Sequence, residues 1–390
     1  MHVGILGGGI AGLSAGIALA QAGHRVSVFE RDVRPRGIGA GVVCWPNAVF
    51  VLEALGVIPR LERVTGRVRA MTRFTATGEV LGRLDVERLE RLCGRPSLSV
   101  LRRDLHDALL GRAAEVGVEI AFGQPLTALE ETPCGARARF ADERSFEADL
   151  LLGAEGRMRS VARDFVVGDG TPIDQGFVNW VGVFEGDRPL FQDMAVRDYW
   201  GLGERFGIVP ISPTAAYWAG GEAREAQPKQ RAGLKARLIE QFGRWADPIV
   251  EVVRGTEDAR INEIQVRDHD PCETWHRANV LLIGDAAHAA LPTSGQGACQ
   301  ALEDAWHLAR VLDSSGSIED ACQTFTELRR AKTTAITQGG RRLAASLFAT
   351  DPSACERRDA EARVVDYGAM VEGMSRFWTS GLPLEELRSR

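Results

Sequence analysis

The chain has 390 residues, of which 45% are hydrophobic and 26% are charged, and it carries a formal net charge of −6. This composition is typical of a folded globular protein and excludes a largely disordered chain. Because 47 basic residues stand against 53 acidic ones, the sequence also lacks the excess of positive charge by which proteins bind nucleic acid. The length predicts two or three domains, or one large fold built around a cofactor.

Cysteine usage and hydropathy indicate a cytoplasmic protein. The seven cysteines are dispersed, and no pair has the two-residue spacing of a zinc or redox motif, so we expect neither a disulfide framework nor a metal site. Residues 10–22 are apolar and include a sequence similar to a signal-peptide cleavage site, but no basic segment precedes them. Since no other apolar run reaches 18 residues, we expect no membrane partner.

The predicted elements begin with a βαβ unit. Residues 1–6 and 25–29 have the pattern of buried strands, and residues 13–22 have that of a helix between them. The Gly- and Pro-rich segment 34–46 predicts a loop. After it, Asn47 is expected to cap a helix that ends near Gly56.

Strands and helices alternate along the rest of the chain. From residue 176 to 220, short alternating runs carry many aromatic side chains, which predicts an antiparallel sheet with one face lining a pocket. After a last strand, the pattern is helical almost to the end. The remaining strands are predicted at 68–84, 118–122, 136–140, 149–152 and 280–283, and the longer helices at 102–116 and 298–312.

A glycine motif near the N-terminus predicts a dinucleotide site. Gly7, Gly9 and Gly12 fit the pattern G-x-G-x-x-G, with a strand before them and a helix after them. Such glycines permit a tight turn, a close approach of the backbone to a pyrophosphate and close packing of helix on strand. Glu30 ends the next strand, where a carboxylate accepts hydrogen bonds from a ribose and repels a 2′-phosphate. We therefore expect FAD or NAD at this motif.

A second glycine-rich block, residues 281–297, has similar logic. Asp285 follows a predicted strand and can hold a ribose or ribityl hydroxyl. A simple strand–turn–helix is the alternative interpretation. The backbone amides at the start of the next helix can stabilise negative charge on a reduced flavin, and they belong to Gly295, Gln296, Gly297, Ala298 and Cys299.

Together these blocks resemble the group A flavoprotein aromatic hydroxylases, the family of para-hydroxybenzoate hydroxylase. Five blocks occur in the family's order along essentially the whole chain: the first glycine motif with Glu30-Arg31, Gly39-Ala40-Gly41 with Trp45-Pro46-Asn47, Arg102-Arg103-Asp104-Leu105, the segment 153–163, and Gly284-Asp285. The resemblance implies an α/β fold in which a Rossmann-like FAD-binding domain is interleaved with an antiparallel-sheet substrate domain, followed by a helical C-terminus. The expected boundaries are 1–70, 98–165 and 270–345 for the FAD-binding domain, 71–97 and 166–269 for the substrate domain, and 346–390 for the C-terminal helices.

The same resemblance implies roles for individual residues. Asp285 would hold the ribityl-phosphate half of FAD, and the segment from Gly295 to Cys299 would lie under the isoalloxazine ring. The adenosine and pyrophosphate half would contact Gly12, Glu30, Arg31, Val43 and Arg102, although Arg102 could also be an ordinary surface charge. Since the chain has one dinucleotide motif, NADH or NADPH would bind transiently. Reduced flavin would then react with O2 to give a C4a-hydroperoxide that hydroxylates a small, electron-rich aromatic or heteroaromatic substrate.

Two positions depart from the family pattern. Glu155 replaces the usual aspartate of the segment that is proposed to serve both FAD and NAD(P)H; its longer carboxylate could keep a hydrogen bond, while its nicotinamide role is open. Segments 175–180 and 201–205 are similar to the subset that contains bacterial FAD-dependent urate hydroxylases. However, Thr293 stands where those enzymes have an acid. A strictly urate-type site is therefore not expected.

Three residues are candidates for the substrate side of the reaction. In the urate-hydroxylase-like subset, an arginine and a tyrosine matching Arg205 and Tyr217 belong to the substrate pocket, so Arg205 would bind an anionic or carbonyl group and Tyr217 would form a hydrogen bond to the substrate oxygen. Pro292 would shape the flavin-facing loop. The structural alternatives are a strand-surface charge for Arg205 and a core aromatic for Tyr217. His288 is better interpreted as a structural histidine than as a base.

Two other functions share most of these features. A non-oxygenating flavin reductase or dehydrogenase would use the same fold and cofactor. A flavin-binding regulatory or carrier protein would bind FAD without consuming NAD(P)H. The aromatic-rich segment favours an enzyme with a pocket, whose partners would be O2 and a small substrate and which would act as a monomer or homodimer.

Overall fold

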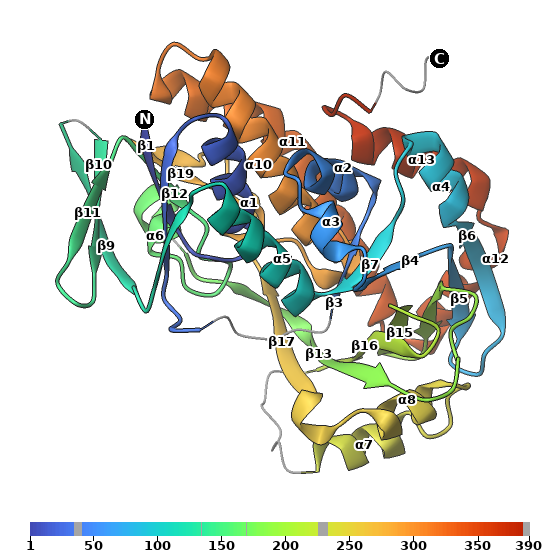
Figure 1. Ribbon diagram of the computed structural model, residues 1–390. Coiled ribbons are helices and arrows are strands. Elements are labelled where there is room, and N and C mark those ends of the chain that lie inside the picture. The colour runs from blue at the N-terminus through green and yellow to red at the C-terminus, as the bar shows by residue number, and fades with distance from the viewer. Residues whose placement is uncertain (35–40, 134, 169, 225–232, 385–390) are drawn as a thin grey trace.

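The computed structural model describes residues 1–34, 41–133, 135–168, 170–224 and 233–384, and Figure 1 shows their arrangement. Within this part of the chain the strands form two large and two small sheets. Helices pack on both large sheets, and the last two helices, α12 (Pro352–Val364) and α13 (Tyr367–Thr379), lie beside the second one.

The first large sheet is mainly parallel and contains the βαβ unit expected at the N-terminus. β1 lies between β2 and β12 and pairs in parallel with both. The order across the sheet is β18 (His276–Arg277), β19 (Val280–Leu282), β12 (Leu150–Gly153), β1 (His2–Leu6), β2 (Arg25–Glu30) and β8 (Glu119–Phe122). The neighbouring strands β1, β12 and β19 therefore come from segments more than 100 residues apart in the chain.

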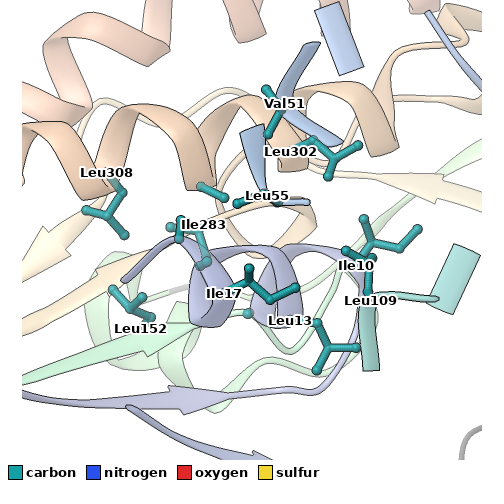
Figure 2. Close-up of a cluster of buried hydrophobic side chains, with 14 of the residues drawn as sticks. Ile10, Leu13, Ile17, Val51, Leu55, Leu109, Leu152, Ile283, Leu302 and Leu308 are labelled. Atoms are coloured by element: carbon teal, nitrogen blue, oxygen red, sulfur yellow. The ribbon is translucent and has the colours of Figure 1, made fainter. Parts of the chain in front are cut away.

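Helix α1 (Ile10–Gln21) is buried along most of its length. Its residues are almost all apolar or small, and a helix with that composition on every side belongs in a core rather than on a surface. Figure 2 shows Ile10, Leu13 and Ile17 between the sheet and the helices above it. The neighbours are Leu152 and Ile283 beside the sheet, and side chains of the helices α2 (Pro46–Ala54), α5 (Arg102–Glu115) and α10 (Gly297–Ser314).

The second large sheet has seven strands and joins distant segments of the chain. β5 pairs in parallel with β14, whereas the other pairings are antiparallel. The order is β17 (Asn262–Asp268), β13 (Ile173–Glu185), β16 (Ala215–Ala223), β15 (Glu204–Pro210), β14 (Ala195–Trp200), β5 (Ala70–Thr75) and β6 (Val80–Asp85). This confirms a largely antiparallel sheet in the aromatic-rich region.

The two faces of this second sheet differ in their packing. One face carries Trp180, Phe206 and Trp218, which are fully buried in a core completed by the helices α7 (Leu234–Gln241) and α8 (Ile249–Gly255). The opposite face carries Tyr217 and Trp200, which pack toward the rest of the molecule. Most of the aromatic side chains that suggested a pocket lining therefore fill a hydrophobic core.

Shorter elements connect the large sheets. One small sheet contains β3 (Gly41–Cys44), β7 (Leu98–Leu101) and β4 (Thr65–Arg67). The other, β9 (Leu126–Thr132), β10 (Gly135–Phe140) and β11 (Ser145–Ala148), projects at the left side of Figure 1. The short helices are α3 (Ile58–Leu61), α4 (Val86–Cys93), α6 (Val161–Val167), α9 (Asp285–His288), η1 (Asp258–Arg260) and η2 (Pro292–Ser294).

The C-terminal part is helical, as the sequence predicts. α11 (Ile318–Leu347) is followed by α12 (Pro352–Val364) and α13 (Tyr367–Thr379). α13 packs against α4, β6 and α2, so the end of the chain contacts the elements around residues 46–93. Among the helices of the described chain, none combines the length and the apolar character that a membrane span requires.

Candidate active site

The first glycine turn has the geometry of a phosphate-binding loop. Gly7 adopts φ 114°, and a Cβ on Gly12 would lie 1.9 Å from the Gly7 carbonyl oxygen, so both positions require glycine. A Cβ on Gly9 would meet no atom within 4 Å, and no side chain caps the helix that starts there. The free N–H groups of α1 therefore point toward open space, where an anion is favoured.

The carboxylate of Glu30 lies at the edge of this turn. It accepts hydrogen bonds from the backbone N–H of Gly8 at 2.8 Å and of Asp32 at 2.9 Å. Because an ionised carboxylate has about four acceptor sites, two remain for a ribose. Arg31 is close by and donates to the Arg159 carbonyl at 3.5 Å. His106, which the sequence did not single out, bonds to the Gly8 carbonyl at 2.7 Å.

The second glycine block lies directly against the first. A Cβ on Gly284 would be 2.6 Å from that of Ala11, so close packing of the two helix starts depends on this glycine. At the beginning of α10, Gln296 occupies the N-cap position without a side-chain cap, and Gly295 before it has φ 62°. The starts of α1 and α10 are both uncapped, and each is therefore a favourable place for negative charge.

Asp285 is held by Arg157, which lies two residues after Glu155, the position that departs from the family pattern. Arg157 donates from Nε and Nη2 to Asp285 Oδ2 at 3.1 and 2.8 Å. Burial opposes the charge, but Arg157 and then Arg102 keep the pKa of Asp285 below its ordinary value. Oδ1 lies on the side of Gly297. Asp285 is therefore an ionised carboxylate whose second oxygen faces the start of α10.

The strand pair β3–β7 brings further predicted residues to this place. Val43 pairs with Ser99, and Arg102 follows directly after β7 as the first residue of α5. The Val43 carbonyl accepts a hydrogen bond from Cys299 Sγ at 3.5 Å. Residues 39 and 40 of the family's loop lie outside the described residues.

Glu155 has a structural task at its unusual position. Its carboxylate accepts hydrogen bonds from the N–H groups of Val161 and Ala162 at 3.1 and 2.9 Å and from the Ser160 hydroxyl at 3.0 Å. Burial raises the pKa of Glu155, while these three donors act against the rise. The longer side chain thus reaches the N-terminus of α6 and keeps hydrogen bonds there.

On the second sheet, Arg205 and Tyr217 share the face opposite the aromatic core. Arg205 pairs with Gly221 and Tyr217 with Val209, so both side chains leave the sheet on one side. Arg205 Nε donates to Asp198 Oδ1 at 2.6 Å, and its Nη2 lies over Gly207. The guanidinium is therefore oriented, and its outer nitrogens remain for a ligand.

Tyr217 connects this face to the strand β3. Its ring lies so close to Gly41 that a Cβ there would be 2.3 Å from the ring. The hydroxyl makes no hydrogen bond to residues that the structure describes, and the pKa of Tyr217 is raised by burial and by the nearby Cys44 and Cys299. The phenol therefore stays protonated and can donate to a substrate oxygen.

The remaining predicted residues lie around the loop before α10. Pro292 begins the turn η2 next to Leu291, which packs in a cluster with Trp200 of the second sheet. The Thr293 hydroxyl donates to the Gly340 carbonyl at 2.8 Å. His288 is buried and bonds to Asp304 at 2.7 Å, which agrees with a structural histidine.

Comparison with known proteins places this site in a family. A family model described as "FAD binding domain" matches residues 1–339. The 3-amino-4-hydroxybenzoate 2-monooxygenase of Streptomyces cremeus is 33% identical over 370 residues, covering 93% of this chain and 92% of that protein. The chain belongs to the FAD-dependent monooxygenases. The predicted family, fold class and FAD cofactor are thereby confirmed.

Two further members of the family are related to urate. FAD-dependent urate hydroxylase from Klebsiella pneumoniae is 31% identical over 329 residues, covering 83% of this chain and 85% of that enzyme. The solved structure of HpxO from the same species, in complex with FAD and uric acid, has a TM-score of 0.90 at 29% identity and covers 98% of this chain and 97% of that one. This monooxygenase thus has the same overall fold as a flavoprotein crystallised with a purine.

Some residues at the site of this monooxygenase were missed in the sequence. Arg157 and Asp198 each orient a predicted residue, yet the sequence assigned neither of them a role, although Arg157 lies within the segment 153–163. Asn47 is not the N-cap of its helix as predicted, because Trp45 takes that position and Pro46 is the first helical residue. Instead, the Asn47 side chain is fully buried and bonds to Gln296.

Proposed function

We propose that this FAD-dependent monooxygenase takes electrons from NADH or NADPH and inserts one oxygen atom into a small, planar, aromatic or heteroaromatic compound with an anionic or carbonyl oxygen. The observation that carries this proposal is the shared face of Arg205 and Tyr217, which offers an oriented cation and a protonated phenol. Relatives named for urate and for an aminohydroxybenzoate support the same substrate class.

The two glycine blocks would hold FAD at opposite ends. Gly7, Gly9, Gly12, Glu30 and Arg31 would bind the adenosine side. Val43 and Arg102 would contact the adenosine and pyrophosphate half as well. The ribityl and ring side would fall to Asp285 and the amides of Gly295, Gln296, Gly297, Ala298 and Cys299. When bound, FAD supplies the electron transfer and the activation of oxygen. The residues of the chain bind and orient the two reactants and exclude water.

The substrate would lie on the exposed part of the sheet face, beside Pro292. The outer nitrogens of Arg205 would bind the substrate's oxygen-bearing edge, because Asp198 already fixes Nε and balances part of the charge. A wholly uncharged substrate would gain less from this cation. Tyr217 would donate a hydrogen bond at the other end of the ring and leave apolar contacts to Val181 and Val209.

The roles that we propose for the parts of the chain follow the predicted domain boundaries. Residues 1–70, 98–165 and 270–345 would serve the cofactor, 71–97 and 166–269 the substrate, and 346–390 would close the fold. The membership of β5 and β6 in the second sheet supports this division. We further propose a cytoplasmic monomer or homodimer, which suits the dispersed cysteines of the sequence.

Substitution of Arg205 tests the substrate site. A first screen of urate, 3-amino-4-hydroxybenzoate and simple phenols for substrate-stimulated NAD(P)H oxidation would give a working substrate. We expect Arg205→Ala to raise KM by roughly 10- to 100-fold, the loss of a charge-assisted hydrogen bond, and Arg205→Lys to recover part of it. Arg188→Ala is the control, since Arg188 is 74% exposed at a distant surface.

The outcome separates the competing functions. Unchanged KM and kcat in Arg205→Ala would refute the substrate role of Arg205. Reaction under ¹⁸O2 with mass analysis of the product tests the oxygenation itself. A product without the label would show a reductase or dehydrogenase, and FAD binding without any NAD(P)H consumption would indicate a flavin carrier.

A further inference from the structure

A cluster of four buried charges lies between α10 and α11. Glu303 and Asp304 come from α10, and Arg329 and Lys332 come from α11. All four are 8% exposed or less. We call these four residues the buried charge cluster. Its two acids and two bases balance each other, so it carries no net charge.

Direct ion pairs hold the cluster together. Arg329 donates to Glu303 and to Asp304, both at 2.8 Å. Lys332 donates to Glu303 at 2.8 Å and also to the carbonyls of Trp378 and Ser380 at 2.8 and 3.1 Å. The cluster thus ties the end of α13 to the middle of α10.

Each acid of the cluster accepts a hydrogen bond from a different segment around the proposed flavin site. Asp304 Oδ2 accepts a hydrogen bond at 2.8 Å from the N–H of Gly284, the residue before Asp285. Glu303 accepts from Asn47 Nδ2 at 2.6 Å, and the same amide group donates to Gln296 Oε1 at 3.0 Å. Asn47 therefore joins the cluster to the N-cap residue of α10.

The surroundings of Asn47 fix the same turn from a second side. Trp45 donates from Nε1 to the Gly295 carbonyl at 2.9 Å, and its ring contacts that of Trp378 at 4.9 Å. Asn47 Oδ1 and Gln296 Nε2 are fully buried without a partner among the described residues. A buried polar group without a partner costs about 1–3 kcal/mol, so stability does not explain why these two amides are buried here.

Stability alone is a weak reason for such a cluster. Removing two charges from water costs more than their attraction returns in many proteins, and well-packed apolar side chains often stabilise a core equally well. In some proteins, buried ionic groups instead fix one geometry among several. Here the fixed geometry is the start of α10 relative to Asp285, the two elements assigned to the flavin.

We propose that Asn47 is a positioning residue for the flavin ring: acting through Gln296, it sets the N-terminal turn of α10, and the buried charge cluster holds Asn47 and Gly284 in one frame. The proposal rests on the assignment of residues 295–299 to the flavin ring made under the proposed function. It adds that the electrostatics of this turn depend on Glu303, and through Lys332 on the end of the chain.

Flavin spectroscopy and potentiometry test this role. We expect Asn47→Ala to weaken FAD binding about tenfold and to shift the visible absorption and circular dichroism of the bound flavin. Because a displaced helix N-terminus stabilises the reduced, anionic ring less, the affinity for reduced FAD should fall about tenfold more than that for oxidised FAD. That difference lowers the midpoint potential by about 30 mV for a two-electron couple. Asn279→Ala is the control, since Asn279 donates one hydrogen bond to the Asp149 carbonyl, away from this turn.

A second variant guards against simple unfolding. Glu303→Gln with Lys332→Met removes one acid and one base together, so that Arg329 and Asp304 remain as a balanced pair. We expect the same direction of change in potential and spectrum. If both variants lost melting temperature but kept the wild-type FAD affinity, flavin spectrum and potential, the positioning role would be refuted. Failure of the wild-type protein to take up FAD would overturn the cofactor assignment itself, and this proposal with it.

Discussion

A single guanidinium, that of Arg157, is bound to three segments. Besides its two bonds to Asp285 Oδ2, it donates from Nη1 to the carbonyls of Arg267 and Ala290 at 3.2 and 3.4 Å. Arg157 itself is fixed through its carbonyl, which bonds to His269 at 2.7 Å. With every donor group engaged, Arg157 holds the carboxylate of Asp285 in one orientation.

Replacement of Arg157 should therefore weaken the cofactor site. In Arg157→Met the side chain keeps its length, but Asp285 loses its partner and the pKa of Asp285 rises because its nearest positive charge is gone. We expect the dissociation constant for FAD, measured by flavin fluorescence, to increase about tenfold. Arg159→Met is the control, since that exposed side chain lies two residues further on. Equal FAD affinities of the two variants would contradict the orienting role.

At the same scale, the sequence predicts some roles and not others. Gly7, Gly12 and Glu30 could be identified because their spacing is typical of a tight glycine turn followed by an acid. The structure has this turn, with Glu30 at its edge. Arg157 and Asp198 act on a side chain from another element, so nothing near them in the sequence reveals the partner. The capping role of Glu155 likewise depends on how far its side chain reaches in space.

At the scale of elements, helix α1 offers a matched pair of glycines. A Cβ on Gly12 would collide with the Gly7 carbonyl, whereas one on Gly16 would meet only ordinary contacts at 3.5 Å or more. We expect Gly12→Ala to abolish stable FAD binding. Gly16→Ala should be neutral or stabilise the protein by up to about 1 kcal/mol, since alanine favours a helix.

The FAD content after purification and the melting temperature of both variants measure this difference. A yellow Gly12→Ala protein with the wild-type FAD content would show that the turn tolerates a side chain. A strong loss of stability in Gly16→Ala would show that the helix packs more tightly than its contacts indicate.

Most predicted elements agree with the structure to within a few residues, because their hydrophobic periods are clear. α5 and α10 begin and end almost where the pattern places them. The predicted start of α2 was wrong because two sequence signals compete there. Asparagine is a preferred N-cap, but proline is preferred at the first helical position, and Pro46 prevailed over Asn47.

At the scale of the molecule, local sequence patterns do not reveal which distant strands pair with each other. The strand β5 lies beside β14, over 100 residues later, and this register decides which side of the sheet faces the rest of the molecule. Alternation of apolar and polar residues predicts that a sheet has two different faces, but it does not tell which face other elements cover. For that reason the aromatic side chains around Trp180 and Trp218 were expected at a pocket and lie instead in the core under α7 and α8.

His307 links the stability of the whole molecule to pH. Burial lowers the pKa of His307 to about 4 from its ordinary 6.5, and Arg329 adds to this effect while Glu303 and Asp304 oppose it. Between these two values the unfolded chain binds a proton that the native protein does not. The free energy of unfolding should therefore fall as the pH decreases through this window, by roughly 3 kcal/mol at about 1.4 kcal/mol per pKa unit.

Urea unfolding at a series of pH values measures this contribution. We expect His307→Leu to lose less stability than the wild type between pH 6.5 and pH 4. An acid limb of the same slope in His307→Leu and wild type would contradict the assignment.

The contact between Tyr217 and Gly41 has a consequence for anyone who wishes to broaden the range of compounds that the enzyme accepts. At Gly41, the strand β3 and the Tyr217 ring are in direct contact with no side chain between them. Randomising position 217 while retaining Gly41 would vary the proposed substrate side without placing a new side chain on β3. Any side chain at position 41 would displace the Tyr217 ring and disturb β3 at the same time. In a library that mutates positions 41 and 217 together, a change in substrate specificity could not be told apart from a loss of FAD binding.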